Sequence, residues 1–101
     1  MISQGFGSIK TEEKIYDEKF NEQGSVKIYE RGFGLNYGDF SITAPYNYIV
    51  AIEKQGEAGL GKIYVKFVVY DMFSSKYDLE FQISDMMYHT LKRRWEETKD
   101  E

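Results

Sequence analysis

The chain has 101 residues, which is the length of one domain. Its 42% hydrophobic and 17% aromatic content is enough for one core, and 30% charged residues with a single proline are unlike disordered or collagen-like chains. The absence of cysteine excludes disulfides and thiolate metal sites, the single histidine leaves few imidazole ligands, and a net charge of −4 argues against nucleic acid or anionic lipid as the partner.

Most of the chain alternates between apolar and polar residues with a period of two, which is typical of half-buried strands. Short groups of turn-forming residues separate these stretches. In chain order, we expect strands at residues 10–20, 25–31, 35–37, 40–43, 46–54, 62–70 and 77–83.

The turns between the early strands follow from glycine and proline. Residues 21–24 end in glycine and predict the first hairpin turn. Pro45 has no amide hydrogen for a strand ladder, so it ends the fourth strand. The phase of the strand at 46–54 stays open, because two pairs of residues could point inward, Ile49 with Ala51 or Val50 with Ile52.

The clearest hairpin pairs residues 62–70 with residues 77–83. The apolar rows are Ile63, Val65, Phe67 and Val69 in the first strand and Tyr77, Leu79, Phe81 and Ile83 in the second. Both rows share one face only if paired residue numbers sum to an even value. The short connection near Phe73 favours a sum of about 146, which places Lys66 opposite Glu80.

The last segment changes to a helical period. Ser84 is a good N-cap, and Asp85 suits the positive end of a helix. The apolar residues that follow share one face and are Met87, Tyr88, Leu91 and Trp95. The pattern predicts an amphipathic helix of about fourteen residues that packs on the open end of the strands.

Seven strands and a terminal helix predict a mainly β fold. The expected domain spans residues 10–98, between a flexible segment at 1–9 and a tail at 99–101. The stretches Phe81-Gln82-Ile83-Ser84-Asp85 and Leu91-Lys92-Arg93-Arg94-Trp95, with this element order, resemble the pleckstrin-homology-like superfold that relatives of GRAM domains share. The resemblance implies a seven-stranded antiparallel barrel, built as two orthogonal sheets of four and three strands, with the C-terminal helix as its cap.

Lipid-binding members of this superfold carry a basic residue, a spacer and then basic-x-basic across the first hairpin. Lys19 and Lys27 match the first two positions here, but Tyr29 stands at the third. The same loop is acidic, through Asp17, Glu18 and Glu22. Because negative charge repels phosphate, binding of a phosphoinositide or another anionic ligand is a further alternative and not our expectation.

The sequence motifs do not indicate an enzyme or a cofactor. Residues 56–62 match the phosphate-binding pattern G-x-x-x-x-G-K, but Ile63 stands where serine or threonine would hold magnesium, and a strand follows instead of a helix. His89 lies on the polar face of the helix. No spacing indicates a metal site, although a carboxylate-only site from distant loops stays open.

No targeting or membrane segment is expected. Residues 1–8 lack a basic leader followed by an apolar run, and the longest apolar run, 67–70, is far shorter than the about twenty residues of a membrane helix. We therefore expect a cytoplasmic protein.

The leading hypothesis is a non-catalytic interaction module that binds a protein or peptide, including another copy of itself. The nine tyrosines suit either a contact surface, because a phenol ring can be half buried with its hydroxyl in water, or packing under loops and against lysine side chains. The resemblance implies a groove between the fifth strand and the terminal helix, formed here by Tyr48, Val50, Ile52, Tyr88 and Arg94.

The alternative is a small-molecule carrier or enzyme with a cavity inside the barrel. The two hypotheses differ in the interior. An interaction module is expected to have a solid core, filled by Phe67, Leu79, Phe81, Leu91 and Trp95, whereas a carrier needs an internal pocket with converging polar groups.

Overall fold

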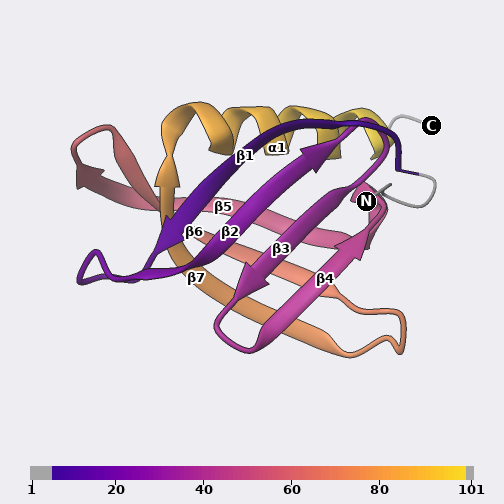
Figure 1. Cartoon of the computed structure of the whole chain (residues 1–101), viewed down its shortest axis with the longest axis horizontal. Helices are drawn as coiled ribbons and strands as arrows, with labels where there is room; N and C mark the ends of the chain where they lie inside the picture. Colours follow the sequence, from indigo (N-terminus) through magenta and orange to yellow (C-terminus); the bar gives the residue numbers. More distant parts are fainter. Residues whose placement is uncertain (1–5, 100–101) are drawn as a thin grey trace.

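The computed structural model describes residues 6–99 and confirms a mainly β protein with seven antiparallel strands and a C-terminal helix (Figure 1). The expectations for residues 1–5 and 100–101 lie outside this range. The strands are β1 (Ile9–Tyr16), β2 (Glu22–Tyr29), β3 (Phe33–Tyr37), β4 (Phe40–Ala44), β5 (Ile49–Gly59), β6 (Lys62–Tyr70) and β7 (Lys76–Ser84). A short 3-10 helix, η1 (Tyr46–Tyr48), precedes β5, and the helix α1 (Asp85–Lys99) follows β7.

The strands form one sheet in the order β4-β3-β2-β1-β7-β6-β5, in which the expected groups of four and three strands are joined. Tyr16 of β1 pairs with Gln82 of β7 and so joins a four-strand half to a three-strand half. Gln82 is fully buried, and its Nε2 donates a hydrogen bond to the carbonyl oxygen of Asp17 at 2.7 Å. In Figure 1 the strands β1 to β4 lie across β5 to β7, so the single sheet folds over its own core.

The expected register of the β6–β7 hairpin is confirmed, since Lys66 lies opposite Glu80. In every pair from Lys62 with Ser84 to Tyr70 with Lys76, the two residue numbers sum to 146. The first turn, in contrast, lies earlier than residues 21–24. It occupies residues 17–21, and β2 continues through Gly24. Gly24 instead allows β3 to approach β2 closely, because a Cβ at this position would collide with the backbone of Asn36.

Residues that precede residue 10 also make hydrogen bonds to distant parts of the chain. Phe6 and Ser8 accept hydrogen bonds at their carbonyl oxygens from the amides of Arg31 and Glu30, at 2.9 and 3.2 Å. A Cβ on Gly32 would collide with the Phe6 ring and with the carbonyl oxygen of Ala44. The segment before β1 therefore packs against the turn that joins β2 to β3.

Aromatic rings fill the core between the two halves of the sheet. Phe33 and Phe81 both contact Phe67, with ring centroids 5.7 and 6.1 Å apart, and all three side chains are buried. Of the other side chains expected there, Leu91 is buried, while Leu79 and Trp95 are half-buried and pack against the core.

A bulge resolves the open phase of β5. The pairing with β6 shifts between Ile49 and Ala51, so Ile49 and Ile52 both face the core while Val50 is 41% exposed. The side chain of Trp95 joins α1 to this strand, because its Nε1 donates to the carbonyl oxygen of Ile49 at 2.9 Å.

The predicted start and apolar face of α1 are confirmed. Ser84 Oγ accepts a hydrogen bond from the amide of Met87 at 3.1 Å and donates one to Glu13 at 2.7 Å. Glu13 of β1 also accepts the amide hydrogen of Ser84, so this cap links the helix to the other half of the sheet. No helix within residues 6–99 is long and apolar enough to cross a membrane.

Candidate functional site

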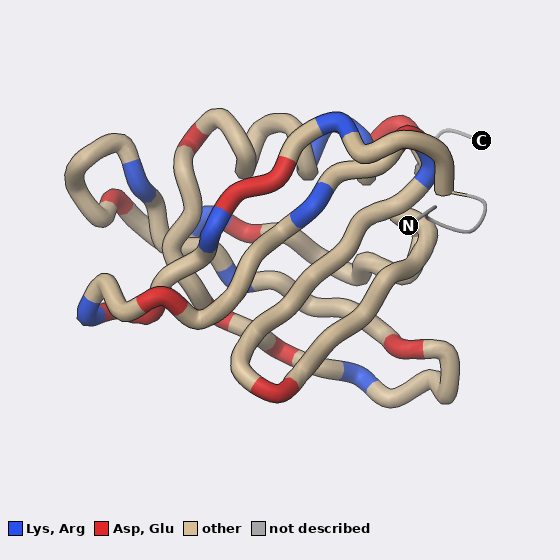
Figure 2. The backbone as a smooth tube through the Cα atoms, viewed as in Figure 1, with Lys and Arg blue, Asp and Glu red and all other residues tan. Residues whose placement is uncertain are grey.

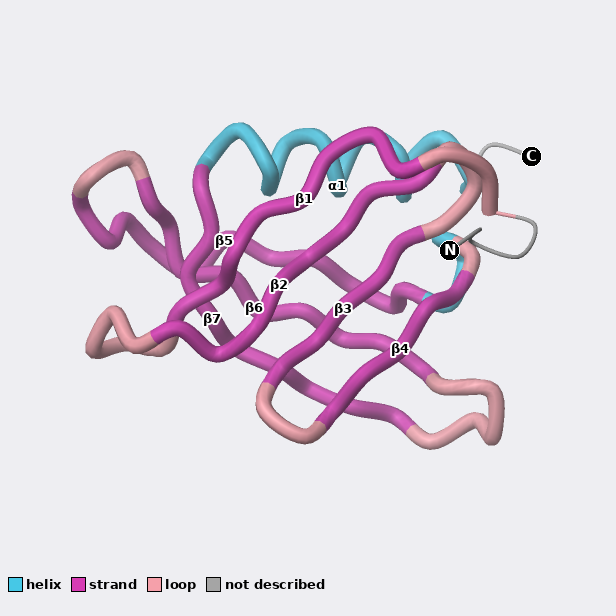
Figure 3. The backbone as a smooth tube through the Cα atoms, in the orientation of Figure 1, coloured by secondary structure: helices cyan, strands magenta, loops and turns pink. Residues whose placement is uncertain are grey.

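Two hairpin loops, at residues 17–21 and 71–75, share one pattern of hydrogen bonds. Figure 3 shows where the two loops lie at the ends of the sheet's strands. Each begins with an aspartate whose amide donates to the last loop carbonyl at 2.9 Å and whose Oδ1 accepts two loop amides at 2.8 and 2.9 Å. In each, the fourth residue has a positive φ, 64° at Phe20 and 66° at Ser74. We term them the first and second Asp loops.

The two loops differ in what they expose. The second and third positions are Glu18 and Lys19 in the first Asp loop, but Met72 and Phe73 in the second. Met72 is 75% exposed and Phe73 is 81% exposed. Since the first loop builds the same backbone with charged residues, the fold does not require apolar side chains at these positions. An exposed apolar pair that folding does not require is a candidate contact surface.

The second Asp loop is held in shape by Asp71. Its pKa is lowered, first by the hydrogen bond from the amide of Ser75, and Tyr77 Oη also donates to its carboxylate at 3.1 Å. A lowered pKa means that the folded loop favours the ionised carboxylate. Its contribution to stability is therefore complete above the pKa of unfolded aspartate and is lost as pH falls through the lower folded pKa.

We expect the amide NMR signals of Phe73 and Ser75 to stay constant from neutral pH to about 5 and to move together at a midpoint below about 3.9, the value of free aspartate. In Asp71→Asn the same signals are expected to show no such transition and to broaden, because an amide oxygen is a weaker acceptor than a carboxylate. A midpoint at or above that of free aspartate would contradict the assigned role.

A hollow of about 450 Å³ lies between β4, η1 and the second Asp loop. We term it the apolar hollow, after the large side chains that line it, which are Phe6, Ile42, Tyr48, Met72 and Phe73. Asp71, Met72 and Phe73 of the second Asp loop line it together with residues 41–45 of β4 and its C-terminal end. The loop thus presents its apolar pair at the rim of a concave surface.

The two terminal strands of the sheet differ in charge. β4 carries none, and its outward residues Ser41 and Thr43 are small and polar. β5 carries charged, exposed residues, among them Lys54 and Glu57, whose side chains pair at 2.7 Å. Charges on an edge strand oppose the addition of another strand. β4 is therefore the edge less protected by charge, and it borders the apolar hollow.

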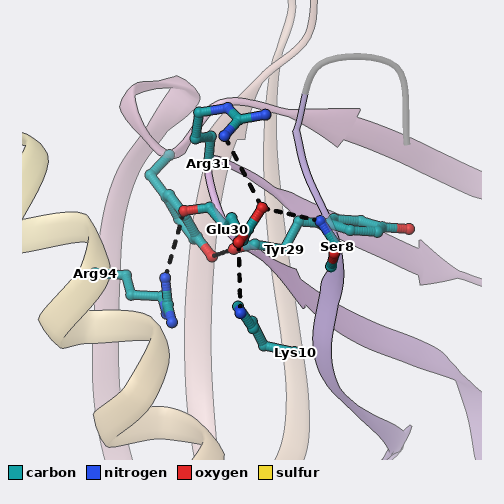
Figure 4. Close-up of polar contacts among 7 residues, drawn as sticks. Ser8, Lys10, Tyr29, Glu30, Arg31 and Arg94 are labelled. Carbon is teal, nitrogen blue, oxygen red and sulfur yellow. Dashed lines mark hydrogen bonds and ion pairs between the residues drawn. The ribbon is translucent and has the colours of Figure 1, made fainter. Parts of the chain in front are cut away.

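A second hollow, of about 430 Å³, lies on the other side of Pro45, which lines both hollows. We term it the arginine hollow; its charged residues are Glu30, Arg31, Arg94 and Glu97. Arg94 reaches from α1 toward the carbonyl oxygen of Glu30, at 3.5 Å from Nη1 (Figure 4). The Glu30 carboxylate faces away from it, toward Ser8, Lys10 and Arg31.

The residues of the predicted groove do not line one surface. Ile52 and Tyr88 lie in the core at 3% and 5% exposure, so a partner at this edge could contact Val50 and the backbone of β5 but not these two side chains. Tyr48 lines the apolar hollow and Arg94 the arginine hollow. The use of this groove stays a prediction, while Tyr48 and Arg94 belong to two neighbouring sites.

The exposed pair at Met72 and Phe73 was missed by pattern reading, which treated the segment as a connection. The available signal was two large apolar residues directly after an aspartate that opens a turn.

Other chemistry has little support among the described residues. No three of their acidic or histidine side chains gather closely enough to hold a metal ion. His89 lies 3.5 Å from Asp85 on the exposed side of α1. Acidic and basic positions are interspersed along the chain (Figure 2).

Comparisons with models of known families, with curated proteins and with solved structures found no match.

Proposed function

We propose that this protein is a non-catalytic interaction module that binds an extended, apolar segment of another protein. The segment lies along β4 and places its side chains in the apolar hollow. The observation that carries the proposal is the exposure of Met72 and Phe73 on a loop whose charged counterpart has the same backbone.

Two further features support this mode of binding. β4 pairs with β3 on one side only, so its other side can supply main-chain hydrogen bonds to an added strand. Methionine and phenylalanine at the rim of the hollow are the residue types that adapt to and anchor apolar side chains. Backbone pairing gives affinity, and the hollow selects side chains.

The interior supports an interaction module over a small-molecule carrier. The rings of Phe33, Phe67 and Phe81 occupy the space between the two halves of the sheet, where a carrier would need an internal pocket. The four-strand and three-strand halves with a C-terminal helix are also what the pleckstrin-homology-like resemblance implies. Charge disfavours a second copy as the partner, since each chain carries −4.

The test is selection from a library of random twelve-residue peptides displayed on phage, followed by affinity measurement with synthetic peptides. We expect enriched peptides to carry alternating apolar residues. The variant M72E/F73K, which copies the first Asp loop, is expected to bind them about thirtyfold more weakly or worse, the effect of losing a binding hot spot.

A matched control is E18M/K19F, which places the same apolar pair on the first Asp loop. It is expected to bind the peptides as the wild type does, and both variants are expected to unfold within about 0.5 kcal/mol of the wild type, as surface changes do. Equal affinity of M72E/F73K, or no enrichment at all, would refute the proposal. Concentration-dependent dimerisation that M72E/F73K abolishes would assign the surface to a second copy instead.

A further inference from the structure

Arg94 has hydrogen-bonding capacity that the described residues do not use. Its Nε is buried and has no hydrogen-bond partner among them. Its Nη1 lies 3.5 Å from the carbonyl oxygen of Glu30, which is long for a hydrogen bond. A buried donor without a partner is costly. A guanidinium with unused N–H groups offers the planar fork that a carboxylate matches.

The acidic residue nearest this side chain is already occupied. Glu30 accepts a hydrogen bond from the amide of Ser8 at 3.1 Å and forms ion pairs with Lys10 at 3.5 Å and Arg31 at 3.9 Å (Figure 4). These contacts lower its pKa, with the Ser8 amide as the largest cause. Two cations thus offset the charge of Glu30, and the charge of Arg94 is left for the arginine hollow.

Tyr46 does not supply a negative charge either. Its Oη donates to the carbonyl oxygen of Tyr29 at 2.9 Å. Burial raises its pKa to about 12, although the charge of Arg94 and a hydrogen bond from Arg94 to the phenol oxygen act in the opposite direction. The phenol therefore stays protonated and its hydrogen is engaged. Glu97, on the exposed side of α1, is the remaining acidic residue of the hollow.

We infer that the arginine hollow binds a carboxylate group of the partner, through the guanidinium of Arg94. The inference rests on the proposed function, because Pro45 lines both hollows and a peptide in the apolar hollow would therefore continue into this one. The partner segment is thus apolar and carries an aspartate, a glutamate or its own C-terminal carboxylate at the end that passes Pro45.

The first arm of the test examines the hollow alone, by following the Nε–Hε signal of Arg94 in NMR spectra at constant ionic strength. We expect sodium acetate to shift this signal saturably and acetamide to leave it in place. In Arg94→Gln, the amide signals of Asn47 and Thr98 are expected to lose their response to acetate. No saturable shift, an equal effect of acetamide, or tighter binding of inorganic phosphate than of acetate would overturn the inference.

The second arm uses the peptides selected above, each made with its carboxylate and with that group as an amide. Arg94→Gln is expected to weaken the carboxylate form by about tenfold, the effect of one lost charge-assisted hydrogen bond, and to leave the amide form unchanged. Arg93→Gln is the matched control, because it removes an exposed neighbouring cation of α1 that does not line the hollow.

The two proposals fail separately in this design. Peptides that depend on Met72 and Phe73 but bind Arg94→Gln normally would overturn the carboxylate site and leave the proposed function standing. Peptides that are indifferent to M72E/F73K would overturn the proposed function, whatever acetate does to Arg94. An equal loss in Arg93→Gln would show that overall charge causes the effect and would overturn the site.

Discussion

Replacing Trp95 by alanine is expected to destabilise the protein by about 3 kcal/mol, near the lower end of the range for deleting a large aromatic side chain. The ring is half-buried and packs against the core. Its Nε1 also donates to the carbonyl oxygen of Ile49 at 2.9 Å, so the substitution removes both packing and the hydrogen bond that ties α1 to β5. Urea unfolding followed by circular dichroism measures the loss.

The control for this prediction is Trp95→Phe. Phenylalanine keeps most of the ring but cannot donate to Ile49, so the expected loss is about 1 kcal/mol, the net value of one hydrogen bond. The difference between the two variants measures the packing of the ring. If both variants lose the same amount, the hydrogen bond alone attaches the helix. If Trp95→Ala loses less than about 1 kcal/mol, Trp95 is not a structural link.

Local patterns were sufficient where neighbouring residues determine the structure. The β6–β7 register could be predicted because both strands carry an apolar row of period two, and a shift by one residue would expose one whole row. The start of α1 could be predicted because Ser84 is followed by a helical apolar period. In both cases the burial of one face decides the geometry.

Side-chain hydrogen bonds explain where the patterns were misleading. Gly24 looked like the first turn, but the carboxylate of Asp17 accepts the amides of Lys19 and Asn21 and so fixes the turn earlier. The phase of β5 stayed open because a bulge lets Ile49 and Ile52 share a face that strict alternation forbids. An apolar–polar pattern of period two predicts neither the side-chain hydrogen bonds of Asp17 nor the bulge in β5.

The candidate sites depend on contacts between distant segments. Pro45 separates the two hollows, and the walls come from β4, η1, the second Asp loop, the β2–β3 turn and α1. The predicted groove joined Tyr48 and Arg94 through a resemblance, whereas the structure assigns them to adjacent surfaces. Among the residues of the two sites, the exposed pair Met72 and Phe73 could be recognised from neighbouring residues, because it directly follows an aspartate that opens a turn.

Gln82→Ala is expected to cost about 3 kcal/mol, because it combines a buried cavity with an unpaired backbone carbonyl. Gln82 is fully buried, pairs with Tyr16 and donates from Nε2 to the carbonyl oxygen of Asp17 at 2.7 Å. This pair is the register contact between β1 and β7, so the two halves of the sheet depend on it. Urea unfolding measures the loss, and amide hydrogen exchange in β1 and β7 locates it.

Gln82→Met is the matched control, because it keeps the side-chain volume and removes both amide atoms. Like Gln82→Ala, it leaves the carbonyl of Asp17 unpaired and deletes the Oε1 of Gln82, a buried acceptor without a partner among the described residues, but it creates no cavity. These two effects oppose each other, so the expected cost is about 1 kcal/mol. Exchange is expected to accelerate at the junction of β1 and β7 before it does so within the β6–β7 hairpin. Uniform acceleration, or a cost below about 1 kcal/mol for Gln82→Ala, would show that packing between the halves holds the sheet together without this residue.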